Sequence, residues 1–155
     1  MKLPIVFGLA LLLSGCGEIG DTEVEDAWIR LPAVQGRPGA AYFHIRTGKD
    51  AETLLAVATP AAIRSEMHET TRVLGGKTGA GAMTMTPLPS LTVPAASSLT
   101  FAPGGKHVML YDVSPALKAG DTAKLALKFA DGDTWEGEAT VVGAGDPAPS
   151  PGSRQ

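Results

Sequence analysis

The chain is short of three things: cysteine, excess positive charge and long apolar runs. Cys16 is the only cysteine in 155 residues, so an intrachain disulfide is excluded. There are 13 lysines and arginines against 16 aspartates and glutamates, which argues against the clustered basic surface that nucleic-acid binding requires. The apolar run over residues 4–13 is too short to span a bilayer as a helix. The length allows one domain with a real core and little room for a second.

The N-terminus has the pattern of a secretory signal, with a basic start, an apolar run and small residues before Cys16. Residues 13–16, Leu-Ser-Gly-Cys, resemble the lipobox of bacterial lipoproteins, in which the chain is cut before a cysteine that then carries lipid. The resemblance implies a signal peptide over residues 1–15, lipidation at Cys16 and a tether over residues 16–23. Gly17 stands where aspartate would favour inner-membrane retention, so the outer membrane is favoured. The alternative is an ordinary signal peptide with an incidental cysteine.

Short apolar stretches separated by glycine and proline predict strands rather than helices. We expect strands over residues 27–32, 40–46, 54–57, 65–70, 82–86, 98–101, 104–110, 123–129 and 134–142. A glycine-rich hairpin loop over 75–81 and a single helical turn over 114–117 complete the list. Together they predict one antiparallel β-sandwich or barrel over residues 24–142, followed by a disordered tail over residues 143–155.

Histidine and methionine are distributed in a way that points to a soft metal site. His107 and Met109 would project from one face of a strand, while Val108 and Leu110 point into the core. Each internal methionine lies beside a histidine or in a Met-x-Met pair, and the later strands contain none. Thioether and imidazole are neutral ligands that suit Cu(I), whereas a blue copper site needs a cysteine thiolate and zinc prefers cysteine, histidine and carboxylate. The alternative is a packed methionine beside a hydrogen-bonded histidine.

The spacing of these residues resembles the motif His-x10-Met-x21-His-x-Met of the periplasmic copper(I) chaperones called PCuAC proteins. Met85 is separated from His107 by 21 residues, and Met109 completes the final pair. His68 is separated from Met85 by 16 residues, six more than in the motif, a difference that a longer hairpin loop absorbs. The resemblance therefore implies a copper site formed by His68, Met85, His107 and Met109, with Met83 as the reserve candidate.

The resemblance extends over residues 24–142, with further landmarks at 26–30, 40–42, 68–70, 103–105 and 117–121. Two residues near the motif receive no metal role. Met67 would point away from His68 in a regular strand and is expected in the core. His44 is expected to be a surface or cross-strand residue.

What the resemblance implies is a cupredoxin-like β-sandwich, not an enzyme, that carries one Cu(I) in the periplasm. It would pass the metal to envelope acceptor proteins, in particular for assembly of the copper-A centre of cytochrome c oxidase. We expect a membrane-anchored monomer whose partners are copper donors or acceptors. Two alternatives come from other classes: a lipid-anchored assembly or adhesion module without metal, and a hydrolase using His68 or His107. The hydrolase lacks a nucleophile motif such as Gly-x-Ser-x-Gly.

Overall fold

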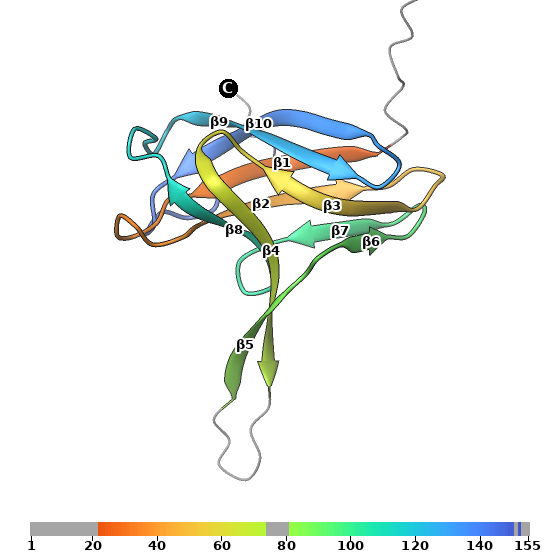
Figure 1. The fold of residues 1–155 in the computed structure, drawn as a ribbon, viewed down its shortest axis with the longest axis horizontal. Coiled ribbons are helices and arrows are strands. Elements are labelled where there is room, and N and C mark those ends of the chain that lie inside the picture. The colour runs from red at the N-terminus through yellow and green to blue at the C-terminus, as the bar shows by residue number, and fades with distance from the viewer. Residues whose placement is uncertain (1–21, 74–80, 151, 153–155) are drawn as a thin grey trace, which may run out of the picture.

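The computed structural model describes residues 22–73, 81–150 and 152, which form ten strands and, within those ranges, no helix (Figure 1). The strands are β1 Glu23–Arg30, β2 Gly39–Arg46, β3 Glu52–Ala58, β4 Ala62–Val73, β5 Ala82–Pro87, β6 Leu91–Val93, β7 Ser98–Phe101, β8 Lys106–Val113, β9 Thr122–Phe129 and β10 Thr134–Val142. The predicted all-β class is confirmed. Among the described residues, no helix is long and apolar enough to cross a membrane.

All ten strands belong to one sheet with the order β5-β4-β8-β2-β1-β10-β9-β3-β6, and β7 pairs with β2 beside this path. Every pairing is antiparallel except that of β1 with β10, so the predicted antiparallel sandwich contains one parallel contact. A parallel pair is possible here because the whole domain, rather than a two-residue hairpin, connects the two strands. Alternation within a single strand carries no information about such a distant partner.

The sheet curls over itself, so that one face of nearly every strand contributes to a single core. Phe43 on β2 stacks on Phe101 of β7 with ring centroids 4.4 Å apart. Leu110 from β8 and Leu125 from β9 belong to the same buried cluster although their strands are far apart in the sheet order. The alternating pattern of β9, in which every second residue is buried, shows the apolar periodicity that predicted the strand.

Several local expectations differ from the structure. Residues 114–117 form a turn rather than the expected helical turn, and the Leu117 amide closes it by donating to the Ser114 carbonyl oxygen. The short strand β6 was not predicted, since three residues carry too little periodicity. The signal peptide, Cys16 and loop residues 75–80 lie outside the described residues. The domain bounds stay a prediction.

Strand β4 is the longest in the sheet, and with β5 it forms a hairpin that extends beyond the body of the molecule (Figure 1). The β4–β5 pairing runs from His68 opposite Pro87 to Val73 opposite Ala82. On its other side β4 pairs with β8 over most of that strand's length. The segment β5-β4-β8 therefore carries every residue of the predicted copper motif.

Candidate metal centre

The two motif histidines lie directly opposite each other on neighbouring strands. His68 of β4 pairs with His107 of β8, their ring centroids are 6.1 Å apart and the rings are inclined by 28°. Both residues are 8% exposed, although the adjacent Met67 and Val108 are the ones that belong to the core. Since side chains alternate along a strand, the two imidazoles lie on the outer face of the sheet and are nevertheless shielded from water.

The two motif methionines lie on the same outer face, on either side of the histidine pair. Met109 follows His107 by two residues and pairs with Glu66 on β4. Met85 of β5 pairs with Thr70, which places it diagonal to His68. Directly paired residues share a face in an antiparallel sheet, so strands β5, β4 and β8 bring all four predicted ligands to one surface.

The register separates the two methionines of β5. Met83 pairs with Arg72, one step further along the hairpin from His68 than the pair of Met85 with Thr70. Both side chains are exposed, by 56% for Met83 and 50% for Met85. Although 16 residues separate His68 from Met85, the pairing of Met85 with Thr70 keeps this methionine next to β4.

His107 is held in a defined tautomer by the loop that leads into β8. Its Nδ1 lies 3.0 Å from the Gly105 carbonyl oxygen, which only accepts, so Nδ1 carries the proton and Nε2 keeps a lone pair. Gly104 has a φ of +82°, a conformation that favours glycine and closes the tight turn before the strand. An imidazole oriented by a backbone carbonyl in this way is typical of a metal-ligating histidine.

His68 has one partnered and one unpartnered nitrogen. Its Nε2 lies 3.2 Å from the Glu66 carboxylate, whereas Nδ1 is buried without a hydrogen-bond partner among the described residues. A buried ring nitrogen with no partner is costly unless a ligand satisfies it. A soft cation fits this place, because the nearby donors are one more imidazole and thioether sulfurs.

Glu66 connects the histidine side of the site to Met109. The Tyr111 hydroxyl donates to Glu66 at 3.1 Å and also lies 3.5 Å from the Met109 sulfur. Arg64 forms an ion pair with Glu66, and its guanidinium lies 3.8 Å from the centroid of the Tyr111 ring. The hydrogen bond from His68, more than any other contact, lowers the pKa of Glu66, so the carboxylate stays charged. Desolvation and the hydrogen bond to Glu66 raise the pKa of Tyr111, which keeps its proton.

Sequence reasoning missed Glu66 and Tyr111. The signal was available in the spacing, since each lies two residues from a predicted ligand and therefore on the same face of its strand. Two other expectations agree with the structure. Met67 is a core residue, 6% exposed, and His44 forms a cross-strand hydrogen bond of 2.8 Å to the Thr100 hydroxyl.

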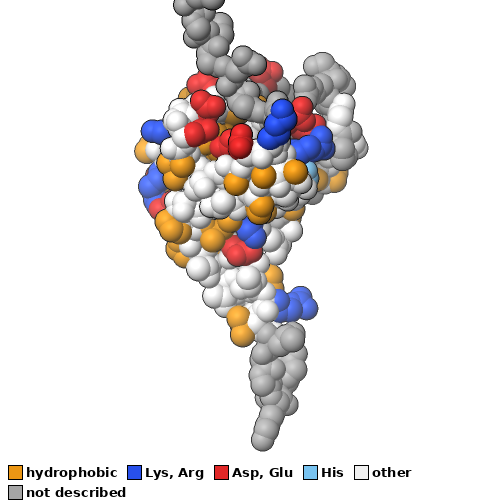
Figure 2. All heavy atoms as spheres, turned by 90° about the vertical axis from the view of Figure 1, so that its right-hand side faces the viewer, with side chains coloured by type: hydrophobic (Ala, Val, Ile, Leu, Met, Phe, Trp, Pro, Cys, Tyr) orange, Lys and Arg blue, Asp and Glu red, His pale blue; other side chains and the backbone are white. Residues whose placement is uncertain are grey.

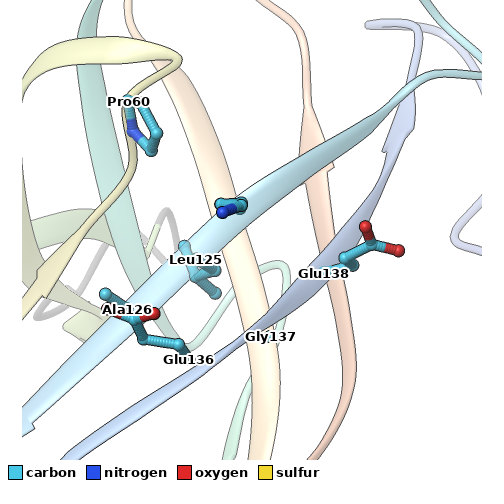
Figure 3. Close-up of a pocket in the computed structure, with 7 residues that line it drawn as sticks. Pro60, Leu125, Ala126, Glu136, Gly137 and Glu138 are labelled. Carbon is cyan, nitrogen blue, oxygen red and sulfur yellow. The ribbon is translucent and has the colours of Figure 1, made fainter.

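Other places in the described residues offer no comparable donor set. No group of three or more His, Cys, Asp or Glu side chains that could hold a metal occurs there, so any site at His68 and His107 depends on sulfur. A pocket beneath Pro60, formed on β9 and β10, contains Lys124 and Glu138 but neither histidine nor methionine (Figure 3). Its lining residues lie in β9, β10 and the turn between β3 and β4, and none belongs to the predicted copper motif.

The family model described as "Putative lipoprotein LpqE-like" matches residues 22–141, which is nearly the whole described domain. The chain belongs to the LpqE-like lipoprotein family. This LpqE-like chain is also 33% identical over 147 residues to "Putative lipoprotein Lxx21020" of Leifsonia xyli, covering 86% of this chain and 84% of that protein.

Solved structures similar to this LpqE-like protein include PCuAC domains. The copper-bound PCuAC domain from PmoF2 has a TM-score of 0.63 and 22% identity, covering 80% of this chain and 94% of the domain. The solution structure of CuI-DR1885 from Deinococcus radiodurans has a TM-score of 0.56 and 35% identity, covering 77% of this chain and 78% of that one. The predicted cupredoxin-like fold of the PCuAC type is confirmed.

Proposed function

We propose that this LpqE-like protein binds one Cu(I) ion through His68, Met85, His107 and Met109 and carries it in the bacterial cell envelope. The observation that carries the proposal is the buried, unpartnered Nδ1 of His68 on the face where the other three donors gather. The 35% identity to a protein solved as CuI-DR1885 supports the choice of metal. Two imidazoles and two thioethers are neutral, so they hold a monovalent soft cation without accumulating negative charge.

The same geometry favours a carrier over a catalyst. His68 and His107 are shielded, while Met85 is half exposed on the hairpin, so a partner's ligand can displace this thioether first. Transfer by successive ligand exchange needs such an accessible position. We infer delivery to envelope acceptor proteins, with the copper-A centre of cytochrome c oxidase as the expected destination. Lipidation at Cys16 would hold the carrier at a membrane surface on the periplasmic side, with the outer membrane favoured.

Titration with Cu(I) under a competing chelator tests the metal site. Wild-type protein is expected to bind one equivalent, and the double variant His107→Ala with Met109→Ala is expected to lose tight binding. His44→Ala is the matched control, because this histidine is hydrogen bonded to Thr100 away from the site. Equal affinity in the double variant would refute the site assignment. A metal-free protein recovered from copper-supplied cells would favour the adhesion or assembly module.

A further inference from the structure

Strand β5 is an edge of the sheet formed by the described residues. Among the described residues it pairs only with β4, and all six of its residues are exposed. Natural proteins usually protect such edges with charged residues, an internal proline or a bulge. The sequence Ala-Met-Thr-Met-Thr-Pro has no charge, and its proline stands at the end. Figure 2 shows apolar side chains and a basic one on the hairpin, above the part drawn in grey.

Two backbone hydrogen bonds define which backbone groups of β5 face outward. The Leu88 amide donates to the Met67 carbonyl oxygen, so Met67 is hydrogen bonded on the β5 side of β4. The Thr70 amide donates to the Gly105 carbonyl oxygen, so the backbone groups of Thr70 face away from β5. Hydrogen-bonded and non-hydrogen-bonded pairs alternate along an antiparallel ladder. The N–H and C=O groups of Met85 and Met83 therefore point out from the edge.

We propose that β5 pairs with β5 of a second copy of this chain, antiparallel, around a two-fold axis at Thr84. This register places Met83 of each copy opposite Met85 of the other, and both residues have outward-facing backbone groups. The pairing is isologous, since the same strand is used by both copies. It departs from the monomer expected from the sequence and gives a weak dimer, because six residues form a short interface.

The chemistry of β5 favours its own copy as the occupant. The strand has no charge to repel itself, and threonine pairs favourably with threonine across an antiparallel ladder. The four methionines of two copies would lie on the face that carries the histidines, because directly paired residues share a face. Met83, exposed by 56% and one step too far from His68 in its own chain, would then lie beside Met85 of the second copy. This added sulfur rests on the proposed copper function, whereas the pairing itself does not.

Sedimentation of the metal-free protein over a range of concentrations tests the pairing. Wild type is expected to show a reversible monomer–dimer equilibrium. Thr84→Lys and Thr84→Asp each place like charges opposite each other at the axis, and each is expected to raise the dimer Kd roughly fivefold or more. An equimolar mixture of the two variants is expected to restore the dimer, which also shows that both are folded. Thr86→Lys is the control, because its partner in this register is Ala82.

The pairing of β5 with itself, its register and the contribution of Met83 can each be refuted by a separate result. A metal-free wild type that stays monomeric at all concentrations, or a mixture of the charged variants that fails to pair, would overturn it. Equal weakening by Thr86→Lys and Thr84→Lys would overturn the register. For the copper-loaded dimer, X-ray absorption is expected to show fewer sulfur neighbours in Met83→Ala than in wild type. If the dimer still forms and the sulfur count is unchanged, only the proposed contribution of Met83 to the copper site is refuted. If the dimer forms but the protein does not bind copper, only the proposed function is refuted.

Discussion

The two histidines and the two hairpin methionines occupy the same face of the sheet, but the fold holds them differently. His68 and His107 are 8% exposed, lie opposite each other and have side-chain hydrogen bonds to Glu66 and the Gly105 carbonyl oxygen. Met85 and Met83 are at least half exposed on an edge strand. In the proposed copper site, the imidazole half is therefore already ordered in the metal-free protein, and the thioether half on the hairpin is open to exchange. A carrier needs both properties, one to retain its cargo and one to release it.

The largest expected effect is on the buried half. His68→Ala removes the unpartnered nitrogen and is expected to weaken Cu(I) binding by about 100-fold, equivalent to about 2.8 kcal/mol. Competition titration measures the change, and the unfolding free energy of the metal-free variant checks that the domain is intact. A loss of only about threefold in Cu(I) affinity would mean that the histidine pair has a structural role. The difference in burial between the histidines and the hairpin methionines would then have no bearing on copper binding.

A smaller effect is expected on the exposed half, and it separates two neighbouring methionines. Met85→Ala is expected to weaken Cu(I) binding about tenfold, because this thioether is diagonal to His68. Met83→Ala is the matched variant, since Met83 is the same residue type with similar exposure, and in dilute protein it is expected to change Cu(I) affinity by less than about threefold. If Met83→Ala weakens Cu(I) binding more than Met85→Ala does, the register of the hairpin in the copper-bound protein differs from the one described here. The six residues by which the His68–Met85 spacing exceeds the motif would then account for the shift.

The smallest effect concerns Glu66, which contacts the buried histidine His68. Glu66 is expected to make the unfolding free energy of the metal-free protein depend on pH. Its pKa is lowered by the hydrogen bond from His68, so the folded state favours the charged carboxylate. This contribution to stability is complete above the carboxyl's ordinary pKa and is lost as the pH falls through the lowered one. Glu66→Gln is expected to lose less stability on acidification than wild type, as measured by denaturant unfolding at neutral and acidic pH. Identical acid sensitivity of the two proteins would exclude this role.

Sequence patterns predicted most of the strands and the face shared by His107 and Met109, because alternation within a strand is a local property. The relation of His68 to His107 came from a resemblance to a family motif, since a cross-strand pair between β4 and β8 depends on register that no single strand encodes. The spacing to His107 favoured Met85 as the ligand and left Met83 as the reserve candidate. The register of the hairpin places Met85 nearer to His68 than Met83, because Met85 pairs with Thr70 and Met83 with Arg72.

Tertiary structure also supplied contacts that spacing within one strand does not reveal. Glu66 and Tyr111 are ordinary polar residues in sequence, and their link between His68 and Met109 appears only when β4 and β8 are paired. The parallel contact of β1 with β10 joins the two ends of the domain across more than a hundred residues. Both depend on long-range pairing, which is the part of a β fold that local periodicity leaves undetermined.

The parallel contact of β1 with β10 has a mechanical consequence. β1 is the first strand after the N-terminal region, and it lies inside the sheet with β2 on one side and β10 on the other. Ladder hydrogen bonds run across the strands, so a pull on the N-terminal end of β1 loads the bonds to both neighbours together, in shear. Peeling an edge strand would break them one at a time. A domain held at a surface by its N-terminus is thus attached through a strand that resists extraction.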